Sequence, residues 1–207
     1  GRFIVGILAT TLNPAAPIIG AAVLTVVFVS AFALHRSGAG RPTAADGLPV
    51  QQAPARELFR PGLVAVTVGV LGMGLFFGSM LTALTSFLSD FGHPEQAGLV
   101  YGVMGVGSAA LALGVAWFPL RFSLRWRWLT FAGLLAASTL ALPFATTVPG
   151  VMLVLLVAGF GVGPTLVTQY SFGAERSPVG RSATVMTILG SAVIVGQSAS
   201  SALVGAL

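Results

Sequence analysis

The sequence predicts an all-α integral membrane protein with about six transmembrane helices. Only 7% of its 207 residues are charged, and the mean hydropathy is +0.96, whereas a soluble domain carries about a quarter charged residues. The apolar residues form uncharged stretches of about 20 or more, which is the length of helix that crosses a hydrocarbon core about 30 Å thick. The alternation of apolar and polar residues that is typical of membrane β-strands is absent. These observations exclude a soluble domain and favour helices over a barrel.

Hydropathy divides the chain into predicted spans with uncertain ends. The spans cover residues 14–34, 62–88, 97–120, 128–145, 149–171 and 182–207. Residues 1–12 are also apolar, but this stretch is too short to cross alone, and Asn13, Pro14 and Pro17 separate it from the first span. We interpret it as the tail of a preceding helix. The chain is therefore expected to be a fragment, an incomplete bundle cut from a longer protein.

Arginine alternates from loop to loop along the chain. The loops after the first, third and fifth spans carry four, three and two arginines, and the loops after the second and fourth spans carry none. Because loops rich in Lys and Arg stay on the cytoplasmic side, the predicted cytoplasmic loops are residues 36–60, 121–127 and 172–181. Residues 36–60 have too few large apolar side chains to fold alone. The expected parts are a tail with one span (1–35), a cytoplasmic linker (36–60) and a five-span portion of a bundle (61–207).

The composition also limits the chemistry that the spans can support. There is no cysteine, and the five acidic residues and both histidines lie in loops or at span ends, so no titratable side chain is expected at mid-membrane. Hydrolases and proton relays need such groups at useful depth. We therefore expect no enzyme, no metal and no cofactor in this segment. The arginines stand beside tryptophans between two spans, which indicates contact with lipid headgroups and no nucleic-acid partner.

Polar and helix-breaking residues mark a candidate solute cavity in three spans. Gly161 and Pro164 interrupt the helical pattern of 149–171, and such interruptions at membrane depth are tolerated only against protein or a water-filled cavity. Thr165 and Gln169 follow on the same face, and an amide in hydrocarbon needs a partner. The competing interpretation is close packing, with hydroxyls bonded to their own helix. The candidate cavity residues are Phe76, Met80, Thr82, Gly161, Pro164, Thr165, Gln169, Ser191 and Gln197.

Three local patterns support a family resemblance. The segment SFLSDFGHPEQAGLVYGVMGVGSA (86–109) is similar to an outer hairpin, and ERSPVGRSATV (175–185) is similar to a turn into a helix. Gly114, Arg121, Arg125 and Arg127 resemble a short basic loop motif, without the acidic residue that normally accompanies it. Together with the order of the loops, these patterns resemble the C-terminal half of a major facilitator superfamily transporter, from its sixth to its eleventh helix. Because this acidic residue is missing, we expect no charge pair at this loop.

The resemblance implies alternating-access transport of a small solute across the plasma (inner) membrane. Family members whose spans have a similar residue composition imply efflux of drug-like or amphipathic metabolites. Uptake or facilitated diffusion of a polar metabolite is an alternative, and a nontransporting membrane scaffold subunit is another. The expected partners are the lipid bilayer and the small-molecule solute, with protons acting only through a part of the protein outside this segment.

Overall fold

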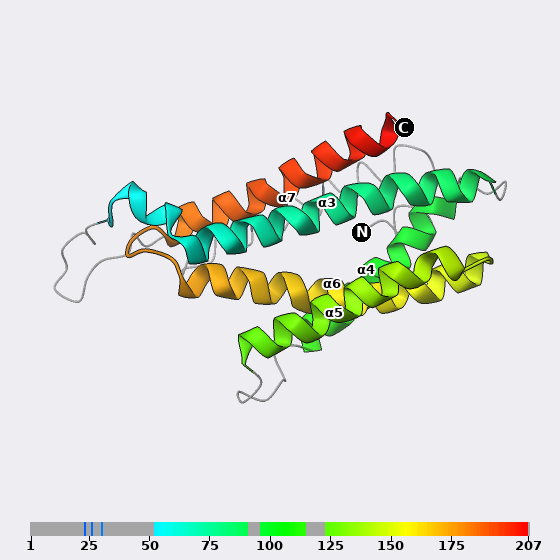
Figure 1. Cartoon of the computed structure of the whole chain (residues 1–207), viewed down its shortest axis with the longest axis horizontal. Helices are drawn as coiled ribbons and strands as arrows, with labels where there is room; N and C mark the ends of the chain where they lie inside the picture. Colours follow the sequence, from blue (N-terminus) through cyan, green and yellow to red (C-terminus); the bar gives the residue numbers. More distant parts are fainter. Residues whose placement is uncertain are drawn as a thin grey trace.

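The structure is a computed structural model that describes residues 52–90, 96–114 and 123–206, together with Val23, Val26 and Ser30. All regular secondary structure within these residues is helical, so the predicted all-α class is confirmed. The elements are η2 (Ala55–Phe59), α3 (Pro61–Asp90), α4 (Ala97–Gly114), α5 (Leu124–Ala141), η5 (Leu142–Phe144), α6 (Val148–Glu175) and α7 (Ser182–Gly205). Figure 1 shows α3, α5, α6 and α7 running roughly along one axis, with α4 crossing them at a steeper angle.

The long helices of the described part match the last five predicted spans. Each is long and apolar enough to cross a membrane. Val23, Val26 and Ser30 are helical, and the remainder of the predicted first span lies outside the described residues. Local chemistry fixes several ends: Pro61 opens α3, where its missing N–H costs nothing, and the Thr147 hydroxyl accepts a hydrogen bond from the Gly150 N–H at the start of α6.

Two of the predicted loops are shorter in the structure. α5 begins at Leu124, inside the predicted loop 121–127, and α6 continues to Glu175, inside the predicted loop 172–181. Hydropathy marks where charged residues begin, but a helix can continue into the headgroup region because its backbone hydrogen bonds remain intact there. The predicted loop boundaries were wrong by a turn of helix at each of these two places.

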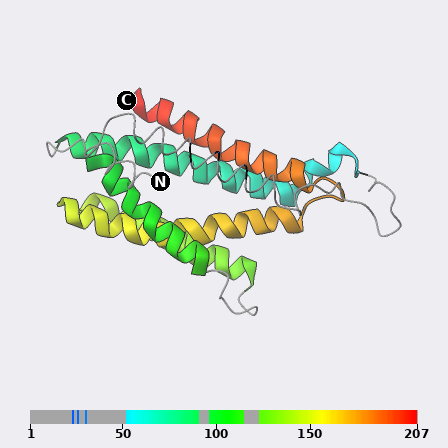
Figure 2. The ribbon, with the colours of Figure 1, turned by 180° about the vertical axis from the view of Figure 1, so that it is seen from behind.

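α6 lies at the centre of the bundle. α3 packs along α7, α4 and α5 pack along α6, and α6 also contacts α3 and α7. α5 covers one side of α6 in Figure 1, and α4 crosses the opposite side in Figure 2. Two buried apolar clusters fill the interior, one joining α3, α4, α5 and α6 and the other joining α3 and α7. α3 and α5 hardly touch each other.

Glycines allow the closest helix contacts. A Cβ built on Gly159 or Gly163 of α6 would overlap carbonyl oxygens of α4, and a Cβ built on Gly74 or Gly78 of α3 would overlap carbonyl oxygens of α7. Lipid provides no hydrophobic drive for association, so membrane helices rely on such close backbone approach. These glycines four residues apart are therefore sites of helix contact.

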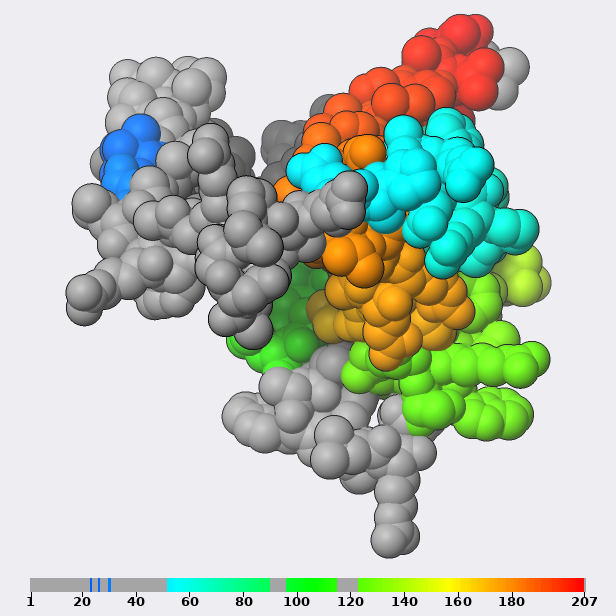
Figure 3. Space-filling model, turned by 90° about the vertical axis from the view of Figure 1, so that its left-hand side faces the viewer, coloured from blue at the N-terminus to red at the C-terminus, as the bar shows by residue number. Residues whose placement is uncertain are grey.

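One end of the bundle carries all the described arginines. It holds η2, the starts of α3, α5 and α7, and the end of α6, and Figure 3 views the molecule from this end. We call it the arginine end. Its arginines are Arg56, Arg60, Arg125, Arg127, Arg176 and Arg181. The positive-inside rule predicts that this end faces the cytoplasm.

Candidate functional site

The most polar buried stretch of the described chain lies in α6. Pro164, Thr165, Thr168 and Gln169 are all buried. The sequence predicts that the helix kinks or opens at Pro164, and the structure shows that it does not open, because α6 runs through this proline as one helix. The Thr168 hydroxyl donates to the Pro164 carbonyl at 2.6 Å, and neighbouring helices enclose the proline, so the surroundings stabilise the continuous helix.

Arg127 extends this polar stretch toward α5. Its Nε donates to the Thr168 hydroxyl at 2.9 Å across the α5–α6 contact. A neutral hydroxyl therefore receives a hydrogen bond from the basic motif, which lacks its usual acidic residue. Of the other motif residues, Arg125 is exposed on α5, Gly114 ends α4, and Arg121 lies outside the described residues.

We predict that Thr168→Val lowers the free energy of unfolding by about 1 kcal/mol, because it removes the acceptor of a half-buried guanidinium while keeping the side-chain volume. The measurement is the thermal midpoint of the purified protein in detergent. Thr130→Val is the matched control, since Thr130 is exposed on α5. Equal midpoints for the two variants would show that the Arg127–Thr168 hydrogen bond contributes nothing.

A cavity of about 220 Å³ lies beside this stretch, at the arginine end between α3, α5 and α6. We call it the arginine-end cavity. No acidic side chain lines it. Its lining residues are Gly62, Ala65, Val66, Gly69, Trp128, Gln169, Phe172 and Arg176. The cavity therefore combines apolar and aromatic walls with one amide and one guanidinium.

Gln169 is the buried polar group of this cavity. It is 4% exposed, and its Oε1 has no hydrogen-bond partner. Gly69 leaves room for its amide, because a Cβ at position 69 would stand 3.1 Å from Nε2. One turn earlier on α6, the Thr165 hydroxyl is buried and also unpartnered. Buried polar atoms are nearly always paired, so two unpartnered oxygens on one helix face indicate a place where a ligand or water binds.

An apolar groove lies further along the space between α3 and α5 and shares no lining residue with this cavity. Its middle section of about 430 Å³ includes Gly72, Met73, Phe76 and Ala136 among its walls. Its outer section of about 230 Å³ includes Phe87 and Val151, and Thr139 borders both sections. We call this the α3–α5 groove. It gives apolar solutes a wall along the length of the bundle.

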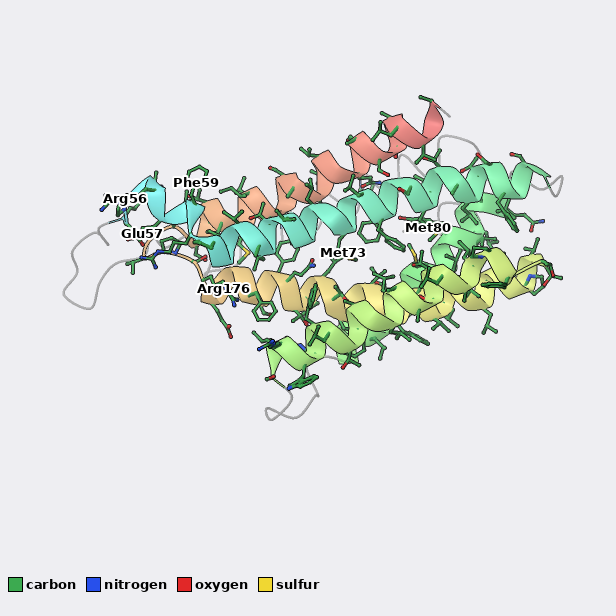
Figure 4. All side chains as sticks on the ribbon, in the orientation of Figure 1. Arg56, Glu57, Phe59, Met73, Met80 and Arg176 are labelled. Atoms are coloured by element: carbon green, nitrogen blue, oxygen red, sulfur yellow. The ribbon has the colours of Figure 1, made fainter. Side chains whose placement is uncertain are left out.

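The structure gathers only part of the predicted cavity residues around these spaces. Gln169 lines the arginine-end cavity, with Thr165 and Pro164 on the preceding turn of α6, and Phe76 lines the groove. Met80 lies in the core with residues of α4 and α6, and Figure 4 shows it pointing from α3 toward α6.

The other predicted cavity residues lie elsewhere. The Thr82 hydroxyl donates to the Gly78 carbonyl of its own helix at 3.0 Å. Gly161 faces the α5 backbone, where a Cβ would stand 2.8 Å from the Phe131 carbonyl oxygen. Ser191 is exposed on α7, and Gln197 is half-buried on the same helix. Contact of these residues with solute stays a prediction.

Sequence reasoning missed the aromatic and charged side chains that line the arginine-end cavity: Trp128, Phe172 and Arg176. Phe172 and Arg176 follow Gln169 by three and seven residues, so helical periodicity places them on the same face. That spacing was a usable signal. Trp128 could not be found in this way, because it belongs to another helix.

Comparison with known families decides what kind of protein carries this cavity. The family model described as Major Facilitator Superfamily matches residues 1–201. The chain belongs to the major facilitator superfamily. It is accordingly a multi-pass membrane protein of a transporter family, and its general function is the movement of a small solute across a bilayer. Comparisons with curated proteins and with solved structures give no significant match.

Proposed function

We propose that this transporter exports amphipathic solutes, such as drug-like compounds or metabolites, from the cytoplasmic side of the plasma (inner) membrane by alternating access. The observation that carries the proposal is the unpartnered Oε1 of Gln169 in a cavity whose other lining residues, apart from Arg176, are apolar or aromatic. The α3–α5 groove adds apolar walls further along the bundle.

The composition of these spaces favours amphipathic solutes over strongly polar ones. Apolar and aromatic walls stabilise rings and alkyl chains, while a few polar groups fix orientation. A sugar or another polyhydroxylated metabolite would need several buried donors and acceptors, because each unpaired polar group costs free energy. The arginine-end cavity offers the Gln169 amide and the Arg176 guanidinium, with Thr165 one turn deeper. This set suits a solute with one or two polar groups.

The position of the cavity supports export as the direction. It lies at the arginine end, which the positive-inside rule assigns to the cytoplasm. α3 and α5 hardly touch each other, so the groove is open along the side of the bundle. A solute dissolved in the cytoplasmic leaflet could enter by this route without first crossing the headgroup layer.

The test is transport of a fluorescent amphipathic compound in inside-out vesicles that contain the intact protein. Gln169→Leu is expected to lower kcat/KM about tenfold, since it removes a buried hydrogen bond to the solute and keeps the apolar volume. Gln96→Ala is the matched control, because Gln96 precedes α4 at the opposite end of the bundle.

Three outcomes would contradict the proposal in different ways. Unchanged kinetics in both Gln169→Ala and Pro164→Ala would show that the solute site is elsewhere. Saturable flux of a polar metabolite, with no flux of amphipathic compounds, would favour uptake or facilitated diffusion. Absence of any solute flux from the intact protein would favour the scaffold alternative.

A further inference from the structure

We propose that the arginine-end cavity selects amphipathic anions: aromatic acids that carry a second polar group on the ring. The acid group binds Arg176 at one end of the cavity, the ring lies between Trp128 and Phe172, and the second polar group reaches Gln169. This assignment rests on the proposed function, since it takes the arginine-end cavity as the solute site.

Arg176 gives the cavity its sign of charge. It is the only charged residue among the lining residues. Its guanidinium lies 4.7 Å from the centre of the Phe172 ring on the same helix, and a Cβ at position 62 of α3 would stand 3.1 Å from its Nε. The exposed side chain of Arg176 therefore lies against the start of α3. A planar guanidinium stacked on a ring still presents its N–H groups to a carboxylate.

Neither neighbouring carboxylate pairs with Arg176. Glu57 pairs with Arg60 at 3.2 Å, which is the only ion pair within the described ranges 52–90, 96–114 and 123–206. Glu175 is exposed and forms no ion pair within these ranges. Arg176 therefore has an aromatic neighbour but no acidic partner in this part of the chain. The anion that completes its charge pairing comes from outside these residues.

Gln169 sets the second requirement. It precedes Arg176 by two turns of helix, or about 10 Å along the axis. Its Oε1 is a buried acceptor without a donor. An aromatic acid with a hydroxyl at the far end of two fused rings has a length close to this separation, and its hydroxyl hydrogen can fill the vacant acceptor. Both polar ends of the solute would then be bound, with the ring against apolar walls.

Arg176 has a competing role, because it follows the last residue of α6 and its charge also favours the negative end of that helix. The choice of probes separates the two roles. We would measure equilibrium binding of 6-hydroxy-2-naphthoate, its neutral amide and the cation 6-(aminomethyl)-2-naphthol to the intact protein in phosphatidylcholine nanodiscs. These compounds share one ring system and differ in the charge of one group, and the zwitterionic lipid supplies no competing net charge.

The acid is expected to bind about tenfold more tightly than the amide, and the cation more weakly than both. Arg176→Gln should reduce binding of the acid to the level of the amide, without changing the amide, whose retained binding shows that the variant is folded. Arg176→Lys should keep part of the preference. Gln169→Leu should remove the advantage of 6-hydroxy-2-naphthoate over 2-naphthoate. Arg56→Gln is the matched control, since Figure 4 places Arg56 on η2 and it does not line the cavity.

Equal binding of the acid, the amide and the cation would overturn the assignment, as would failure of all three to bind. The same weakening in Arg56→Gln and Arg176→Gln would overturn it too, because it would trace the preference to the general positive potential of this end. Export of amphipathic compounds without a preference for charge would refute the anion site and leave the proposed function standing. Selective binding of the acid without any flux would support the anion site and refute the proposed export.

Discussion

Gly163→Leu is expected to prevent stable packing of α4 against α6. A Cβ at position 163 would overlap the Ser108 carbonyl oxygen, and it would stand 2.9 Å from the Ser108 carbonyl carbon and 3.0 Å from the Ala112 Cβ. The overlapping atom belongs to a helix backbone, so no rotamer change relieves it, and the two helices must separate. Overpacking of this kind costs about 3 kcal/mol, which corresponds to a fall of about 10 °C in the thermal midpoint.

The measurement is the thermal midpoint and the monodisperse fraction of the protein in detergent, followed by size-exclusion chromatography. Gly133→Leu is the matched control, because a Cβ at position 133 of α5 meets nothing within 4 Å. Both substitutions replace a helical glycine by the same side chain. A similar fall for both would mean that intrinsic effects on the helix, and not the α4–α6 contact, govern the result.

Gly74→Leu is expected to have a comparable effect on the contact between α3 and α7. A Cβ at position 74 would overlap the Val193 carbonyl oxygen. On the other side of the contact, a Cβ on Gly196 would stand 2.9 Å from the Leu75 nitrogen. We expect a loss of about 3 kcal/mol in the free energy of unfolding, measured as the same thermal midpoint.

This prediction has a specific second part. Since the overlap is with the backbone of α7, Val193→Ala should not rescue Gly74→Leu, although it shortens the side chain of the residue whose carbonyl is overlapped. Gly190→Leu on α7 is the control, because a Cβ there meets nothing within 4 Å. Recovery of the midpoint in the double variant Gly74→Leu/Val193→Ala would show that side-chain crowding, and not backbone contact, brings α3 and α7 together.

From the sequence alone the polar residues of α6 could be picked out, but the contacts between helices could not. The buried Thr165 and Gln169 could be found because polar side chains stand out in an apolar span and because their spacing places them on one face. The partner of Arg127 could not be found, since Thr168 is 41 residues away and the pair depends on how α5 crosses α6. The position of Gly161 could not be predicted for the same reason, because it lies against the α5 backbone only as a result of how α5 crosses α6.

The sequence by itself determined the membrane class, the positions of the last five spans to within a few residues and the gathering of arginines at one end. Each of these features follows from the transfer of single residues between water and hydrocarbon, which depends on local composition and length. Only the tertiary structure decided which glycines hold helices together, that α6 continues through Pro164, and that Gln169, Trp128 and Arg176 share one cavity. These features depend on contacts between helices, which are set by the packing of side chains far apart in the chain.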